Sequence, residues 1–231
     1  MSAMVMQAQS IQLHYDLGRN LYPTEEPNRP KVTVTLEGLD IDKWGLWYYF
    51  VDIDNSRKYS EAFYTELTRE IKLGSTSPIS VHLEYNGGTS KSMSYQQAAL
   101  LGAAWNGNTA DYSKTWGVQL LYKHFFKSYS GTHPYASAQL TGIWGMNFLN
   151  NTIRFSGFID FWRGENAANG HGKLVVLSEP QLWYNLNTIP GLKDFNLSIG
   201  TEVEISNNFV FNEANDKTFF INPTLALKWS F

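Results

Sequence analysis

The chain has 231 residues, no cysteine and a formal net charge of −3. These values exclude a disulfide framework, a thiolate metal site and a basic surface for nucleic acid. The mean hydropathy is −0.31, and no apolar run approaches the roughly 18 residues that a membrane-spanning helix needs. The length suits one all-β barrel or sandwich without a second domain.

The first nine residues are set apart from the expected fold. Residues 2–8 are small and apolar, and Met6-Gln7-Ala8 resembles the end of a secretory signal cleaved before Gln9. The charged start and most of the apolar core of a signal are missing. We therefore expect residues 1–9 to be a signal remnant or an artificial tail, and residues 10–231 to form one β-barrel domain.

Twelve runs of alternating polar and apolar residues follow, separated by turn signals. Most are near the ~9–11 residues of a tilted membrane strand, and an even number is the rule in single-chain bacterial barrels. The expected strands are residues 10–17, 31–39, 45–54, 63–73, 79–86, 94–106, 115–127, 136–148, 152–163, 173–186, 195–206 and 219–231. The connections that would face outside are longer on average than the others, as in outer-membrane barrels.

The last strand shows the alternation most clearly. Leu225, Leu227, Trp229 and Phe231 share one face, and the chain ends on the aromatic Phe231. This ending is typical of bacterial outer-membrane β-barrels. Aromatic residues make up 15% of the chain, which suits belts of Trp and Tyr at two membrane interfaces.

Together these patterns predict a single-chain, twelve-stranded antiparallel transmembrane β-barrel in the bacterial outer membrane, surrounded by lipid and lipopolysaccharide. A soluble barrel or sandwich remains the alternative, because it shows the same alternation with its apolar face inward. A membrane barrel turns its apolar face to lipid. On this face we expect Ile11, Val34, Val81, Leu140, Ile199 and Leu227.

The polar face of the strands favours the membrane barrel. It mixes acids with large aromatics, which is an unusual composition for a solvated surface. The aromatics are Tyr48, Phe50, Tyr64, Phe158, Trp162, Trp183 and Phe220. Eleven acids share this face: Asp16, Glu37, Asp52, Asp54, Glu66, Glu70, Glu84, Asp160, Glu179, Glu202 and Glu204. Five bases oppose them: Lys72, Lys123, Lys127, Arg154 and Lys228. The lumen is thus expected to be narrow and to disfavour anions.

Two arginines fall on the lipid side of the pattern. Arg163 ends its strand, where the membrane interface is within reach. Arg69 lies inside its strand, so either an interfacial position or a bulge near residues 67–70 that turns it inward is expected.

Several segments resemble known outer-membrane families. Asp42-Lys43-Trp44-Gly45, Phe50-Val51-Asp52 and the stretch from Glu66 to Ile71 resemble the Tsx family of nucleoside-specific channels, although the proline expected before Arg69 is missing. A second resemblance covers nearly the whole chain, to Bacteroidetes outer-membrane proteins related to those channels. It rests on Leu83-Glu84-Tyr85-Asn86-Gly87-Gly88, Phe158-Ile159-Asp160-Phe161-Trp162-Arg163, Glu179-Pro180-Gln181-Leu182-Trp183-Tyr184-Asn185 and Leu225-Ala226-Leu227-Lys228-Trp229.

The resemblance implies a channel for passive uptake of small polar solutes such as nucleosides. Aromatic faces would stack on the base, and carboxylates would accept hydrogen bonds from the sugar or exocyclic amines. We expect a solute site, on four strands of opposite walls, formed by Phe50, Asp52, Glu66, Phe158, Asp160, Trp162, Glu179 and Trp183.

Two other function classes stay open. The lumen residues could form a network that fills the barrel, leaving a non-conducting accessory protein that docks envelope partners through residues 18–30, with three prolines, and residues 207–220. An outer-membrane enzyme would need His14 with Asp16, or Ser80 with His82, as its only local acid–base pairs. Such pairs arise easily in polar strands, so we expect no enzyme, and nothing in the sequence requires a cofactor. The five histidines do not cluster in sequence, so we expect no metal, with a pair formed by His14 and His82 as the alternative.

Overall fold

The computed structural model describes residues 6–56, 58–91, 94–128, 132–165, 173–210, 212 and 214–231. Residues 1–5 lie outside the described part, and with them most of the segment expected to be a tail. Strand β1 begins at Met6, whose register partner is Ile41. The first strand is therefore longer than expected, and residues 6–9 belong to the barrel.

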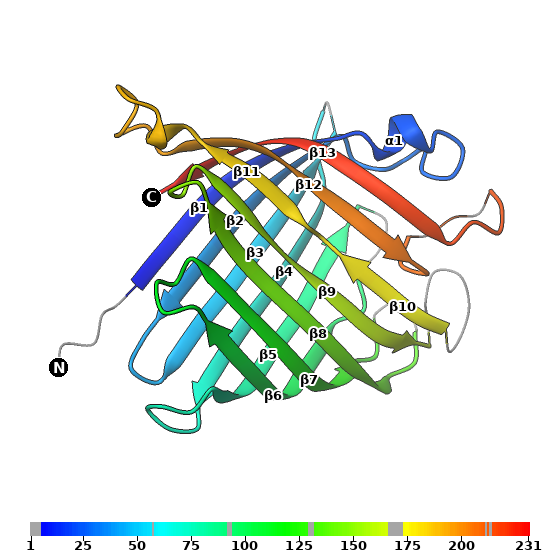
Figure 1. Ribbon diagram of the computed structural model, residues 1–231. Coiled ribbons are helices and arrows are strands. Elements are labelled where there is room, and N and C mark those ends of the chain that lie inside the picture. The colour runs from blue at the N-terminus through cyan, green and yellow to red at the C-terminus, as the bar shows by residue number, and fades with distance from the viewer. Residues whose placement is uncertain are drawn as a thin grey trace.

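Almost all the regular secondary structure of the described chain is β-strand (Figure 1). The strands are β1 (Met6–Asp16), β2 (Val32–Ile41), β3 (Gly45–Asn55), β4 (Ser60–Lys72), β5 (Ile79–Ser90), β6 (Ala98–Asn108), β7 (Lys114–Phe125), β8 (Tyr135–Phe148), β9 (Ile153–Gly164), β10 (Lys173–Ser178), β11 (Gln181–Asn185), β12 (Leu197–Asn207) and β13 (Phe219–Ser230). Two short helices, α1 (Gly18–Leu21) and η1 (Leu186–Thr188), lie in connections. No helix among the described residues has the length and apolarity to cross a membrane.

The thirteen segments form a closed ring of twelve antiparallel strands, as predicted. Strands β10 and β11 both pair with β9 and with β12, in one continuous register. They are one strand interrupted at Glu179 and Pro180, because proline has no N–H to give to the ladder. The ring closes where β1 pairs with β13, Leu13 opposite Leu227.

The outer face of the barrel is apolar. Of the six residues expected to face lipid, Ile11, Leu140, Ile199 and Leu227 are exposed and Val34 and Val81 are half-buried. Exposed aromatics also lie on this face, namely Trp47, Trp105, Trp116, Tyr122, Phe148 and Tyr184. A surface of this kind is stable only in lipid.

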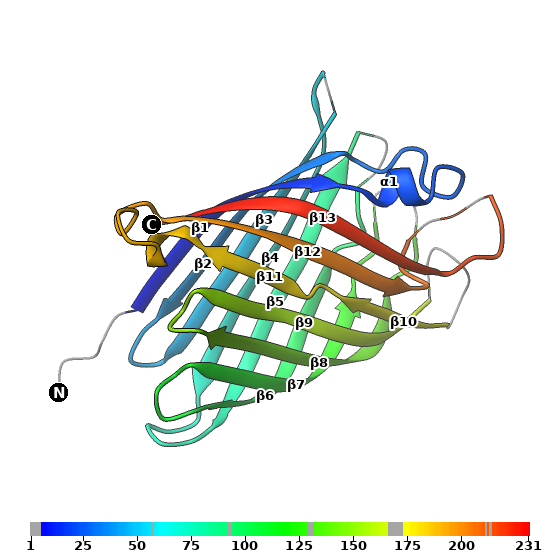
Figure 2. The same ribbon diagram turned by 45° about the horizontal axis from the view of Figure 1, so that its top comes forward.

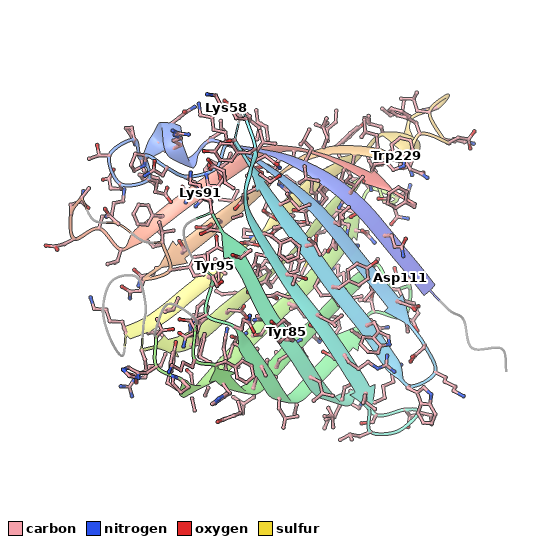
Figure 3. The ribbon with its side chains drawn as sticks, turned by 180° about the vertical axis from the view of Figure 1, so that it is seen from behind. Lys58, Tyr85, Lys91, Tyr95, Asp111 and Trp229 are labelled. Carbon is pink, nitrogen blue, oxygen red and sulfur yellow. The ribbon has the colours of Figure 1, made fainter. Side chains whose placement is uncertain are left out.

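The two ends of the barrel are easy to tell apart. Figure 3 shows Lys58 and Lys91 at the end that also carries α1, and Asp111 toward the end at which the N-terminus lies. We call the α1 end the outer mouth, on the expectation that the N-terminus is periplasmic. Figure 2 shows the connection that contains α1 beside the outer end of β13.

Arg69 points outward without any bulge, so the alternative of an inward turn is wrong. Its register partners are Trp47 and Leu83, in uninterrupted ladders. The guanidinium stacks 4.9 Å from the Trp47 ring and bonds Asp42 in the β2–β3 turn at 2.9 Å. The pKa of Asp42 is lowered, first by the hydrogen bond from Arg69. This interfacial pairing explains how an arginine is tolerated on a lipid-facing strand.

Candidate functional site

All eight residues expected to form the solute site face the lumen, seven from strands and Glu179 from the break between β10 and β11. The register pairs Phe50 with Glu66, and the face that they share alternates with the lipid-facing one. On the other wall, Asp160 lies opposite Thr141 and Trp183 opposite Arg154. Seven of the eight side chains are half-buried, while Trp183 is wholly buried.

Carboxylates from opposite walls approach one another across the lumen. Glu179 interacts electrostatically with Glu202, Asp52 and Glu66, and Glu66 interacts with Asp160. We call these five carboxylates, from β3, β4, β9, the β10–β11 break and β12, the acidic zone. The fold thus brings together all four acids of the expected site and adds Glu202.

The hydrogen bonds of the acidic zone come from neutral groups, while Lys123 interacts electrostatically with Glu66 and Asp160. Thr35 donates a hydrogen bond to Asp52, and Tyr64 donates one of 2.8 Å to Glu66. The Glu179 carboxylate accepts no hydrogen bond from the described residues, although the Glu179 amide donates one to the Phe158 carbonyl. Such carboxylates keep acceptor capacity for a solute or for water.

An aromatic patch, formed by Tyr48, Phe50, Tyr64 and Phe158, lies beside the acidic zone. The Phe50 ring is 6.3 Å from that of Tyr48 and 6.0 Å from that of Tyr64, in tilted arrangements. Phe158 lies on β9, two residues before Asp160. These side chains are half-buried, so part of their surface is open to the lumen.

The two tryptophans of the expected site differ. The Trp183 ring has no exposed surface: Lys228 Nζ lies 4.1 Å above it and the His14 ring meets it edge-on at 6.1 Å. It cannot stack on a solute in this state. Trp162 is half-buried, with Lys123 Nζ 4.5 Å from its ring, and it keeps an accessible part.

Another part of the lumen is occupied by buried and half-buried polar residues that hydrogen-bond to one another. Glu70 is 2% exposed and accepts hydrogen bonds from Asn106 and from Gln119. His82 lies between Glu70 and Glu84, at 3.3 and 3.0 Å. We call these five residues the filled wall. They close the side of the lumen lined by β4 to β7.

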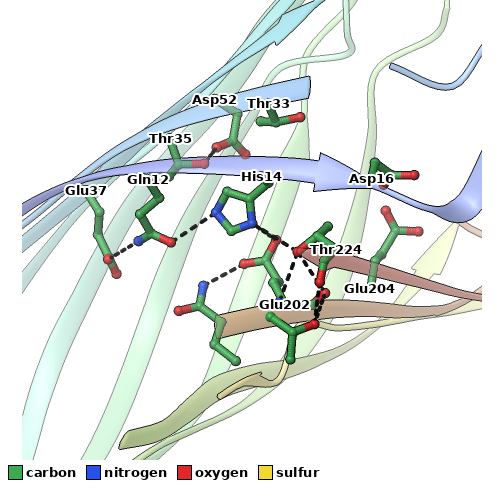
Figure 4. Close-up of polar contacts among 12 residues, drawn as sticks. Gln12, His14, Asp16, Thr33, Thr35, Glu37, Asp52, Glu202, Glu204 and Thr224 are labelled. Carbon is green, nitrogen blue, oxygen red and sulfur yellow. Dashed lines mark hydrogen bonds and ion pairs between the residues drawn. The ribbon is translucent and has the colours of Figure 1, made fainter. Parts of the chain in front are cut away.

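A further network surrounds His14 on β1 (Figure 4). The two ring nitrogens lie 3.1 Å from Gln12 and 3.2 Å from Thr224, and Gln12 donates to Glu37 at 2.8 Å. His14 therefore has partners other than Asp16, which binds Arg29 at 2.9 Å.

The second acid–base pair considered for an enzyme is not assembled either, because the ring of His82 binds Glu70 and Glu84 rather than Ser80. Among the described residues there is no group of three or more His, Cys, Asp or Glu that could hold a metal ion.

The outer mouth holds a cluster that the strand pattern did not reveal. Arg29, from the β1–β2 connection, bonds Asp16 and Glu204 at 2.9 Å each and Glu26 at 3.2 Å. Asn222 of β13 donates to Glu26 at 3.1 Å. We call these five residues the mouth cluster. Alternation assigns faces only within strands, so nothing in the sequence marked Glu26 or Arg29 as inward.

Two of the five expected lumen bases do not reach the lumen interior. Lys72 is the exposed last residue of β4, and Lys127 is exposed beyond the end of β7. Lys123, Arg154 and Lys228 point inward, and Arg29 joins them at the mouth. Four bases therefore face the described lumen where five were expected, so the excess of acids over bases is at least as large as expected.

A comparison with protein families shows the family to which the chain belongs. A family model described as "Domain of unknown function (DUF5020)" matches residues 8–231. The chain belongs to the DUF5020 family. No curated protein sequence matches it significantly.

Two solved porins resemble this DUF5020 barrel. The NanC porin has a TM-score of 0.60 and 14% identity, covering 96% of this chain and 98% of its own. The KdgM porin, solved in complex with disordered oligogalacturonate, has a TM-score of 0.53 and 12% identity, covering 97% and 99%. At such identities the likeness shows the fold. This fold and the apolar outer face place the DUF5020 chain in the bacterial outer membrane, so the soluble alternative is wrong; the Tsx kinship stays a prediction.

Proposed function

We propose that the protein is an outer-membrane channel for passive uptake of small polar organic solutes. The observation that carries the proposal is the acidic zone beside the aromatic patch, both half-buried and facing the lumen. Porins share the fold. The acid excess favours neutral or cationic solutes over an acidic sugar such as oligogalacturonate, because carboxylates would repel one another.

Nucleosides are the solutes that we propose first. A base can stack on the open surface of Phe50, Phe158 or Trp162, and such contacts are worth about 1–3 kcal/mol each. Asp52 and Glu179 can accept hydrogen bonds from ribose hydroxyls. Weak contacts suit a channel, because the solute must also leave. The resemblance to the Tsx channels supports this choice.

A non-conducting accessory barrel is the second candidate. The observation that favours it is the filled wall, whose buried hydrogen-bonded side chains occupy part of the lumen. The docking surface proposed for this role loses support, because the part of residues 18–30 that forms the mouth cluster turns inward rather than outward.

Single-channel conductance in planar bilayers tests the proposal. Steady current that adenosine reduces would support a channel with a solute site, and a silent barrel would support the accessory role. Replacing Phe50 and Trp162 by Ala should weaken the block by adenosine about tenfold or more, since each stacking contact contributes about 1–3 kcal/mol.

The matched control is Tyr122→Ala, because Tyr122 is an aromatic on the lipid-facing side of β7 and is 55% exposed. Its block by adenosine should equal that of the unmodified protein. Unchanged block in the Phe50 and Trp162 variant would remove the site, while conductance itself would still report the channel.

A further inference from the structure

The β1–β2 connection, residues 17–31, folds onto the inner face of the barrel mouth. Tyr22 packs edge-on against Phe220 at 5.1 Å, and its hydroxyl accepts a hydrogen bond from the Ile221 amide. Phe220 and Asn222 are inward positions of β13 and are 0% exposed. The connection therefore covers wall that would otherwise line the pore.

Close contact with the wall is possible because the second residue of the connection is a glycine. A Cβ on Gly18 would collide with the Asn222 side chain and would touch the Asp16 carboxylate. The Gly18 amide instead donates a 2.7 Å hydrogen bond to Asp16. The chain is thus held against β1 and β13 from its first residues onward.

Two buried oxygen atoms in the mouth cluster have no partner among the described residues. They are Glu26 Oε2 and Asn222 Oδ1, on side chains that are 4% and 0% exposed. The same two side chains already share one hydrogen bond, from Asn222 Nδ2 to Glu26 Oε1 at 3.1 Å. If Glu26 is ionised, both orphan atoms are acceptors, and each costs free energy. One proton on Glu26 Oε2, donated to Asn222 Oδ1, satisfies both.

We propose that residues 17–31 form a pH-sensitive latch, docked on the pore wall while Glu26 is protonated and paired with Asn222, and released when Glu26 ionises. In the docked state the carboxyl and the carboxamide exchange two hydrogen bonds. In the ionised state the buried Oε2 and Oδ1 are both acceptors without a donor, which favours moving the connection into water.

The charged groups around Glu26 agree with a latch that is released when Glu26 ionises. Burial raises its pKa, Arg29 lowers it and Glu204 raises it again, and the net shift is upward from 4.5. Arg29 already binds Asp16 and Glu204, so its charge is shared. With Glu26 ionised, three carboxylates would surround one guanidinium.

The direction of the pH dependence of docking follows from the raised pKa of the Glu26 carboxyl. The docked state has its full stability below pH 4.5, the ordinary pKa of Glu26, and loses it as the pH rises through the raised pKa. The pore should therefore widen with rising pH.

Conductance between pH 4 and pH 8 tests the latch. The unmodified protein should show a rise with a midpoint above 4.5. Glu26→Gln should lose the rise and keep the low value, because a carboxamide reproduces the protonated pairing at every pH. Glu26→Ala should keep the high value. The control is Glu25→Gln, since Glu25 is the neighbouring acid and binds Asn215 instead.

A measurement of position is needed in addition, because a barrel can be silent for other reasons. The chain has no cysteine, so spin labels can be placed by Asn28→Cys and Lys58→Cys, two exposed positions in different outer connections. The distance distribution should be narrow at low pH and broad at high pH, and should stay narrow in Glu26→Gln. The same distance distribution at every pH, or an unchanged pH transition of that distribution in Glu26→Gln, would refute the latch. Neither result would contradict the proposed channel.

Discussion

Glu70 and Glu179 are both acids on the inner face of the barrel, yet their surroundings are opposite. Glu70 belongs to the filled wall and is enclosed by His82, Asn106 and Gln119, each within hydrogen-bond distance. Glu179 belongs to the acidic zone, where its neighbours are other carboxylates. The first arrangement holds strands together, and the second leaves carboxyl groups facing the pore. Lumen position alone therefore does not define a functional residue.

The largest expected contrast is in stability. Glu70→Ala takes one hydrogen-bond partner from each of His82, Asn106 and Gln119, the first and last of which are buried. Removing one member of a buried ion pair costs about 3–5 kcal/mol. Glu179→Ala removes a carboxylate that has no hydrogen bond to lose, and should change stability by less than about 1 kcal/mol. Urea unfolding of the barrel in lipid vesicles measures both variants. Equal losses would mean that the two regions do not differ.

Ion selectivity should show the reverse contrast. Asp52→Gln, Glu66→Gln and Glu179→Gln combined should lower the permeability ratio of cations to anions severalfold, since a charge about 4 Å from an ion contributes about 1 kcal/mol even in water. Glu84→Gln in the filled wall should change that ratio less, because His82 and Thr68 already bind this carboxylate. Reversal potentials under a salt gradient report the ratio. Anion preference of the unmodified pore would contradict the acidic zone.

The smallest expected effect comes from an ion pair outside both regions. Arg69 lowers the pKa of Asp42 through its hydrogen bond on the outer face. A lowered pKa means that the pair stabilises the fold above pH 3.8, the ordinary pKa of Asp42, and that this contribution is lost as the pH falls through the folded value. Asp42→Asn should thus unfold more easily than the unmodified protein at pH 7, and the difference should shrink at pH 3. A difference that is independent of pH would refute the pairing.

The alternation of side chains, together with the mixture of acids and large aromatics on the polar face, was sufficient to predict the membrane barrel. Strict period two makes neighbouring residues face opposite sides, so Leu13 and His14 could be assigned without coordinates. Strand ends were less certain, because β1 extends back to Met6 and the tenth strand breaks at Pro180. Those details depend on pairing partners, which one strand does not reveal.

Tertiary structure alone decided what each inward residue does. The approach of Asp52 and Glu179 depends on the curvature that brings opposite walls together. Trp183 and Trp162 look alike in sequence, but a lysine and a histidine cover one of them completely. Glu26 and Arg29 lie in a connection without any period, so only the folded chain shows that they enter the mouth. Sequence determines the face of a strand residue through local backbone geometry, whereas its partners come from strands distant in the chain.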